Sequence, residues 1–149
     1  MDNLFDPAVR DRILARFEAL RPDAEKQWGT MDAGRMVAHC ALTMEAATGD
    51  RPVKRGLMAR ILGPLFKGAI LGPKPFGRDA PTHPDFRVPG PMDIGKERER
   101  LVAVIRKFVA AGPAAAARQE HGFVGKITGD EWGVLMAKHL DHHLNQFGG

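Results

Sequence analysis

Apolar residues recur at helical spacing near the start of the chain and again after a short polar linker. Asp6 before Pro7 is typical of a helix start, and the first helix is expected to run to about Leu20. Either Thr30 or Asp32 can cap a second helix. One side of that helix carries, up to the glycine that should end it, Met36, Val37, His39, Cys40, Thr43 and Ala47.

The middle of the chain is apolar but interrupted. Residues 56–71, GLMARILGPLFKGAIL, contain Gly63 and Pro64, which predict short helical pieces instead of one helix. Residues 72–91 are rich in proline and show no convincing period. They are expected to form a long loop packed over the surface.

The last third of the chain predicts two more helices. Asp93 can cap a third long helix, with an apolar face that ends near residues 111–112. A glycine-punctuated connector follows at 121–127. Thr128 and Glu131 then form a capping-box pattern, which opens a last helix that should run to about Phe147.

Together these elements predict an all-α fold, in which three or four long amphipathic helices form a helical bundle with one broken segment. No stretch shows the sustained alternation expected of strands, and no repeat is present. A length of 149 residues fits one domain, residues 1–149. The core of such a bundle is the usual place for a metal or ligand site.

Composition indicates the class of protein and its expected location in the cell. Hydrophobic residues make up 44% of the chain and charged residues 27%, which is typical of a globular protein. The first residues are acidic where a signal peptide would be basic, and no apolar run is long enough to span a bilayer. With a single cysteine as well, the expected location is cytoplasmic.

The positive charge of the chain is local. The net charge is +4, and residues 51–78 carry seven Lys or Arg and no acid. A solvated face is the commonest cause, while an anionic small molecule, a membrane surface or nucleic acid are possible targets. The stretch lacks zinc-finger spacing and has no interleaved aromatic residues beyond Phe66 and Phe76, so no nucleic-acid partner is expected.

Half of the six histidines lie in KHLDHH, residues 138–143. His139 and His143 are one helical turn apart on the apolar stripe, a spacing that lets two imidazoles chelate a divalent metal. Two histidines hold a metal weakly, and His39 on the apolar face of the second helix is the candidate third donor. Three imidazoles would leave at least one position open for water or substrate.

A purely structural interpretation of these residues also stands. His39 can be a hydrogen-bonded core histidine, and KHLDHH can be a polar helix end that interacts with the helix dipole. The residues alone leave both interpretations open. Cys40 lies about 100° around the helix from His39 and is expected to be a small core residue, not a ligand or nucleophile.

Three stretches resemble the DinB-like (DinB/YfiT) superfamily of proposed metalloenzymes, in particular a bacterial family of unknown function within it, number 1569. They are QWGTMDAGRMVAHC at 27–40, LGPKPFGRDAPTHPDF at 71–86 and HGFVGKITGDEWGVLMAKHLDHHLNQFG at 121–148. The last stretch is the most specific, because its order of histidines and glutamine is similar to the end of the superfamily's fourth helix.

The resemblance implies a DinB-like four-helix bundle, often a homodimer, with a divalent metal such as Zn²⁺ or Ni²⁺ on His39, His139 and His143. His142 matches a flanking histidine that is not a ligand. Better-characterised relatives include thiol-cofactor transferases and an isomerase that uses a low-molecular-weight thiol, in which the metal is thought to activate the thiol. A low-molecular-weight thiol is therefore an implied cofactor.

Two functions remain open. The first is a metal-dependent enzyme, a thiol S-transferase or a hydrolase, whose small-molecule substrate would be anionic if Arg55, Arg60 and Lys67 bind it. The second is a non-enzymatic binding module that docks on a membrane surface or a partner protein through residues 55–71. The first is preferred, because apolar residues at helical spacing belong more often to the core and Gly63 and Pro64 argue against one surface helix.

Overall fold

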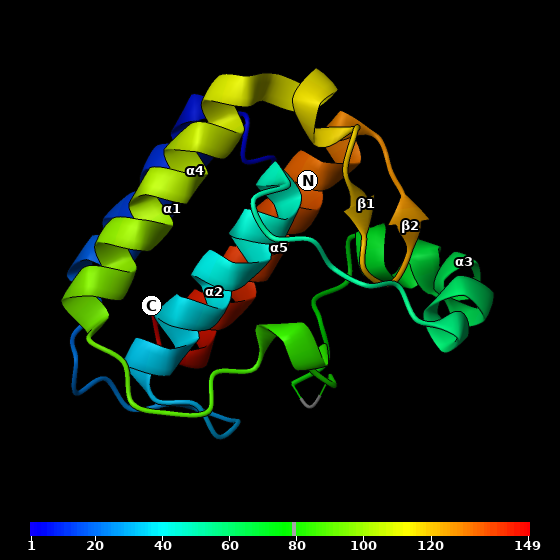
Figure 1. The fold of residues 1–149 in the computed structure, drawn as a ribbon. Helices are drawn as coiled ribbons and strands as arrows, with labels where there is room; N and C mark the ends of the chain where they lie inside the picture. Colours follow the sequence, from blue (N-terminus) through cyan, green and yellow to red (C-terminus); the bar gives the residue numbers. More distant parts are fainter. Residues whose placement is uncertain (79) are drawn as a thin grey trace.

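The chain is mostly helical in the computed structural model, which describes residues 1–78 and 80–149 (Figure 1). Five α-helices are joined by loops, one 3₁₀ turn and one antiparallel pair of very short strands. In chain order the elements are α1 (Pro7–Ala19), α2 (Ala33–Thr48), α3 (Leu57–Leu71), η1 (Pro84–Phe86), α4 (Ile94–Ala116), β1 (Glu120–His121), β2 (Gly125–Lys126) and α5 (Gly129–Gln146). Among the described residues, no helix combines the length and apolarity that a membrane span requires.

Side-chain caps fix where four of the helices begin. Asp6 accepts the backbone N–H of Ala8 at the start of α1, and Asp93 accepts that of Lys96 at the start of α4. Asp32, and not Thr30, caps α2. The predicted starts of α1, α2 and α4 are therefore confirmed, as each cap satisfies a backbone donor that the first turn leaves free.

One hydrophobic core lies between α1, α2, α4 and α5. In Figure 1 these four helices run side by side, and α4 and α5 each contact both α1 and α2. The largest fully buried side chains come from all four and include Phe17, Met36, Phe108, Trp132 and Leu140. Burial of this apolar surface is the main stabilising term for the arrangement.

Residues 57–71 form one helix, so the prediction of short helical pieces is wrong. Pro64 lies inside α3 and has no N–H to donate to the carbonyl oxygen of Arg60. Both residues are exposed, so that carbonyl is near solvent. Gly63 is buried, and a Cβ there would come within 2.1 Å of the carbonyl oxygen of Phe123. The glycine therefore serves close packing instead of ending the helix.

The predicted end of the third long helix is confirmed, but the chain turns helical again at once. Gly112 has φ +81 and breaks the regular helix, and Pro113 begins a short second piece of α4. The connector at 121–127 forms most of the β1–β2 hairpin. The sequence shows no strand pattern there and did not predict it. Each strand has only two residues, too few to show alternation.

The predicted loop between α3 and α4 is confirmed in its described part. It carries η1, which contacts α2, and Val88 in it is buried. Asp79 lies outside the described residues. The loop therefore lies against the helix that carries His39, as Figure 1 shows for η1 and α2.

Candidate metal centre

Helix α2 holds His39 on its buried side. His39 is only 4% exposed, and a buried imidazole without a hydrogen bond would lose solvation energy. Its Nδ1 lies 2.8 Å from the backbone carbonyl oxygen of Phe86, at the end of η1. Because a carbonyl oxygen only accepts, Nδ1 carries the proton and Nε2 keeps a free lone pair.

Helix α5 brings His139 and His143 to the same place. The Thr128–Glu131 capping box is present as predicted and fixes the start of the helix. The two histidines then follow one turn apart, with His143 buried and His139 partly exposed.

The three imidazoles converge. Each offers one nitrogen, and these nitrogens lie within 4.8 Å of one another. The Nε2 atoms of His39 and His139 are 3.2 Å apart. Two nitrogens bound tetrahedrally to an ion at 2.0–2.1 Å lie about 3.3 Å apart, so this separation fits a shared ion.

The tautomer of His143 is set by Gln146. The Gln146 amide nitrogen donates to the carbonyl oxygen of Trp28 at 2.8 Å, which leaves its Oε1 to face Nδ1 of His143 at 2.9 Å. Nδ1 of His143 therefore donates, and its Nε2 keeps a free lone pair.

His139 has a weaker partner of the same kind. The Thr43 hydroxyl donates to the carbonyl oxygen of Cys40 at 2.9 Å, so its oxygen can accept from Nδ1 of His139, 3.4 Å away. His139 can also place its proton on Nε2 and donate to His39. In that tautomer the lone pair on Nε2 of His39 has a donor, whereas Nε2 of His143 has none.

Burial keeps the three imidazoles neutral. Burial, and then the neighbouring His39, lowers the pKa of His143 to about 3. Burial first and the adjacent imidazoles second hold the pKa of His139 well below its usual value. Burial also lowers the pKa of His39, against a smaller opposite effect of its hydrogen bond to Phe86. Neutral imidazole is the form that binds a metal ion.

The donor set therefore fits a divalent transition metal. With the proton of His139 on Nδ1, three neutral nitrogens meet with their lone pairs facing one another, and only a cation or a proton relieves that arrangement. Three protein ligands with an open position are typical of catalytic zinc sites, whereas structural sites have four. No carboxylate or thiol joins the three histidines in the part of the chain that the structure describes.

Comparison with known families matches residues 7–148 to a family described as "Protein of unknown function (DUF1569)". The chain belongs to this family. No curated protein and no solved structure matches it.

In this DUF1569 protein the acidic and thiol groups that lie near the histidines in the sequence have structural contacts. Glu45 accepts two hydrogen bonds from the Arg100 guanidinium, which holds the pKa of its carboxyl below the usual value. Asp141 pairs with Arg16. The Cys40 thiol is fully buried beside the Met36 sulfur, as expected of a core residue.

His142 stands beside the three histidines without joining them. Its ring is partly exposed and lies against Trp28 and Phe76, at centroid distances of 5.6 and 5.8 Å. It is not among the converging donors, which agrees with the flanking role that the resemblance implied.

The three cations expected to bind substrate lie on or beside α3. Arg55 donates through Nε to the carbonyl oxygen of Phe123 and through Nη2 to that of Ala59, so it ties α3 to the hairpin. Lys67 lies 3.5 Å from a Glu131 carboxylate oxygen. Arg60 is exposed. The structure does not bring them together with the histidines as one site, and substrate binding by them stays a prediction.

The groups that orient the imidazoles are not apparent from the sequence. Gln146 gave a signal, because it follows His143 by three residues on the same stripe, and Thr43 lies four residues after His39. The Phe86 carbonyl gave none, because a backbone acceptor 47 residues away depends on how the loop folds.

Replacing Gln146 with methionine is expected to weaken Zn²⁺ binding roughly 10- to 100-fold, because His143 loses the acceptor that fixes its tautomer. The matched control is Asn145→Met, which changes the adjacent exposed amide and should leave affinity within about twofold of wild type. Competition titration against a chromophoric chelator measures both. Equal affinities in the two variants would mean that Gln146 does not orient the ligand.

Proposed function

We propose that the protein is a metal-dependent enzyme with a DinB-like four-helix bundle, in which Nε2 of His39, His139 and His143 hold one divalent ion. The observation that supports this most is the acceptor beside each Nδ1, because three protons on Nδ1 leave the three Nε2 lone pairs directed at one another. Zn²⁺ and Ni²⁺ both suit imidazole ligands. A core histidine with a structural role needs one partner, not a convergence of three.

Other residues of the chain position the three imidazole ligands. The Phe86 carbonyl, Thr43 and Gln146 orient the three rings, and surrounding apolar residues keep them neutral. A bound divalent ion would supply Lewis acidity toward water or a thiol at the open position.

The reaction class follows from that open position. We propose either a transfer that uses a low-molecular-weight thiol as cofactor or a hydrolysis, on a small-molecule substrate. That an anionic substrate is bound by Arg55, Arg60 or Lys67 stays a prediction from the sequence. A cytoplasmic location and a homodimer are part of the same proposal, and both rest on the sequence and on the resemblance.

The metal content of freshly purified protein tests the proposal. Inductively coupled plasma mass spectrometry should find close to one divalent transition-metal ion per chain, and almost none in the variant with His39, His139 and His143 all changed to alanine. His83→Ala is the matched control, since His83 uses its Nδ1 to accept the backbone N–H of Asp85. Equal metal in the triple variant and wild type would refute the metal centre.

A further inference from the structure

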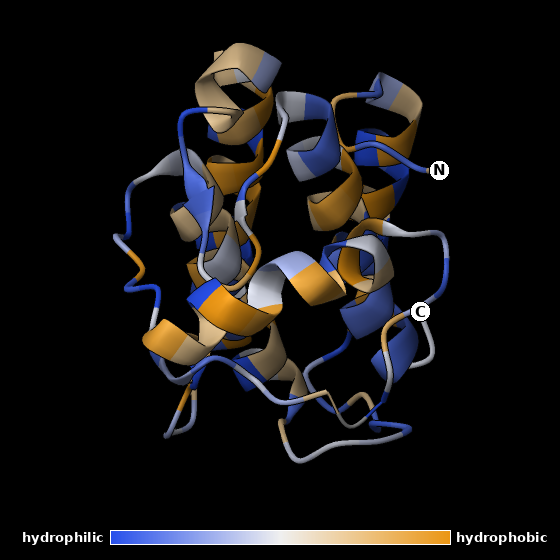
Figure 2. Cartoon of the chain, turned by 90° about the vertical axis from the view of Figure 1, so that its right-hand side faces the viewer, coloured by the Kyte–Doolittle hydropathy of each residue, from blue (hydrophilic) through white to orange (hydrophobic). Residues whose placement is uncertain are grey.

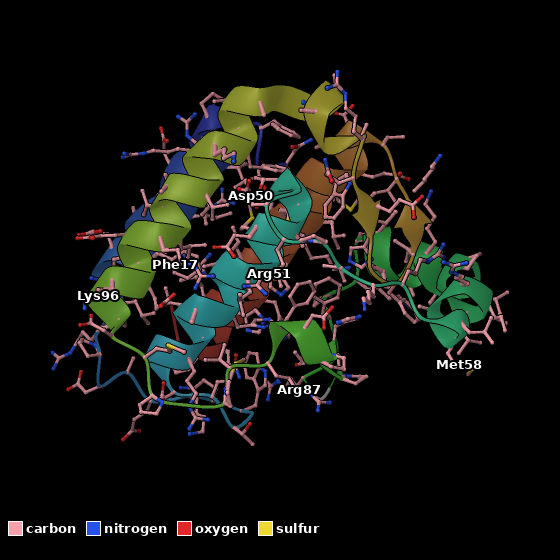
Figure 3. The ribbon with its side chains drawn as sticks, viewed as in Figure 1. Phe17, Asp50, Arg51, Met58, Arg87 and Lys96 are labelled. Carbon is pink, nitrogen blue, oxygen red and sulfur yellow. The ribbon has the colours of Figure 1, made fainter. Side chains whose placement is uncertain are left out.

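Helix α3 turns its apolar side outward. Leu57, Met58, Ile61 and Leu65 are 72%, 65%, 58% and 76% exposed, and they follow one another on one face. Figure 2 looks at the molecule from the side on which α3 lies, and Figure 3 shows Met58 at the outer end of the molecule, away from the shared core. Side chains of this size are seldom left exposed together without a binding role.

This orientation is built into the contacts of α3 and is not a loose packing. On its inner side Gly63 packs against the Phe123 carbonyl, and Arg55 donates to the same oxygen. At its C-terminal end Lys138 of α5 donates to the carbonyl oxygens of Ile70 and Gly72, at 2.8 and 2.9 Å. These contacts fix which side of α3 faces the core, so the other side stays available to a partner.

The charges of the segment that contains the exposed face have one sign. Lys54, Arg60 and Lys74 are exposed before, on and after α3, and the sequence from residue 51 to residue 78 contains no acid. A short helix with an apolar face and cationic flanks is typical of segments that lie in the headgroup region of an anionic membrane. Two copies of the chain meeting through this face would instead bring like charges together.

We propose that α3 docks the protein on an anionic lipid surface, with Leu57, Met58, Ile61 and Leu65 entering the headgroup region and the flanking cations contacting lipid phosphates. The proposal does not depend on the metal centre, because it uses the side of α3 that faces away from it. Docking through α3 would place the protein's chemistry beside a membrane.

Co-sedimentation with vesicles tests the docking. Wild-type protein should bind phosphatidylcholine vesicles that contain about 30% phosphatidylserine at low salt, and should bind pure phosphatidylcholine at least about tenfold more weakly. About 0.5 M salt should release most of it, because charge attraction at the surface is screened. Ile61→Ser/Leu65→Ser should lower binding about tenfold or more, and Arg60→Glu roughly tenfold.

Matched controls separate docking from general effects of charge or polarity. Lys96→Glu makes the same charge change at an exposed site on α4, far from α3 in Figure 3, and Met92→Ser removes an apolar side chain that is 40% exposed elsewhere. Both should bind vesicles as wild type does. All substituted positions are exposed, so circular dichroism should show an unchanged fold.

Three results would overturn the proposal. The first is wild-type protein that does not bind the anionic vesicles at low salt. The second is Ile61→Ser/Leu65→Ser protein that binds as wild type does. The third is a wild-type dimer in analytical ultracentrifugation without lipid that this double variant abolishes, which would make a second copy the occupant of the face.

Discussion

Changing His39 to alanine is expected to weaken Zn²⁺ binding by more than about 100-fold, because the two imidazoles left on α5 hold a metal weakly. The loss should exceed that of any change to the orienting residues, since it removes a donor atom instead of its support. Isothermal titration of metal-stripped protein at fixed pH measures the affinity. The same result is expected of His139→Ala and His143→Ala.

His142→Ala is the control for this experiment. His142 neighbours a ligand in the chain and is half-exposed, but its ring lies against Trp28 and Phe76. Its removal should leave affinity within a few-fold of wild type. If His39→Ala bound Zn²⁺ as tightly as His142→Ala, His39 would not be a ligand.

Changing Leu140 to alanine is expected to lower the free energy of unfolding by about 3 kcal/mol, within the range for a fully buried leucine. Leu140 is 0% exposed and lies between the two histidines of α5 in the sequence. The cavity would cost transfer free energy and lost contacts, while the donor atoms remain. Metal affinity per folded molecule should therefore stay close to wild type, unlike in the histidine variants.

Urea denaturation of metal-stripped protein measures this loss. The control Leu65→Ala removes the same atoms from a side chain that is 76% exposed and should change the free energy of unfolding by less than about 0.5 kcal/mol. A loss below about 1 kcal/mol in Leu140→Ala would contradict the burial of this side chain in a close-packed core.

Where helix ends depend on local chemistry, the sequence predicted them well. The Asp6, Asp93 and Thr128 caps are all made by atoms within a few residues of one another. The end of the regular part of α4 at Gly112 follows from the conformational freedom of glycine. These features do not depend on how distant segments pack.

The candidate site was predictable for a related reason. Helical spacing puts His139 and His143 on one face, and an apolar helix face carries His39 inward. Whether the two faces meet is a matter of tertiary packing, and the sequence left it open. The contacts that select each tautomer depend on the loop and on the chain around Trp28, so they could not be derived from spacing.

Helix α3 shows where such reasoning fails. Gly63 and Pro64 predict an interruption that the structure does not show, and helical spacing predicts core positions for apolar residues that are exposed. Periodicity identifies an apolar face but does not say what covers it. Here the contacts of Arg55, Lys67 and Gly63 hold the opposite side inward.

Anomalous X-ray diffraction at the metal absorption edge, on crystals of protein loaded with Zn²⁺, tests the central claim most directly. The account predicts one strong peak at about 2.0–2.2 Å from Nε2 of His39, His139 and His143 together. A peak bonded to fewer than three of these nitrogens, or no peak between α2 and α5, would contradict it.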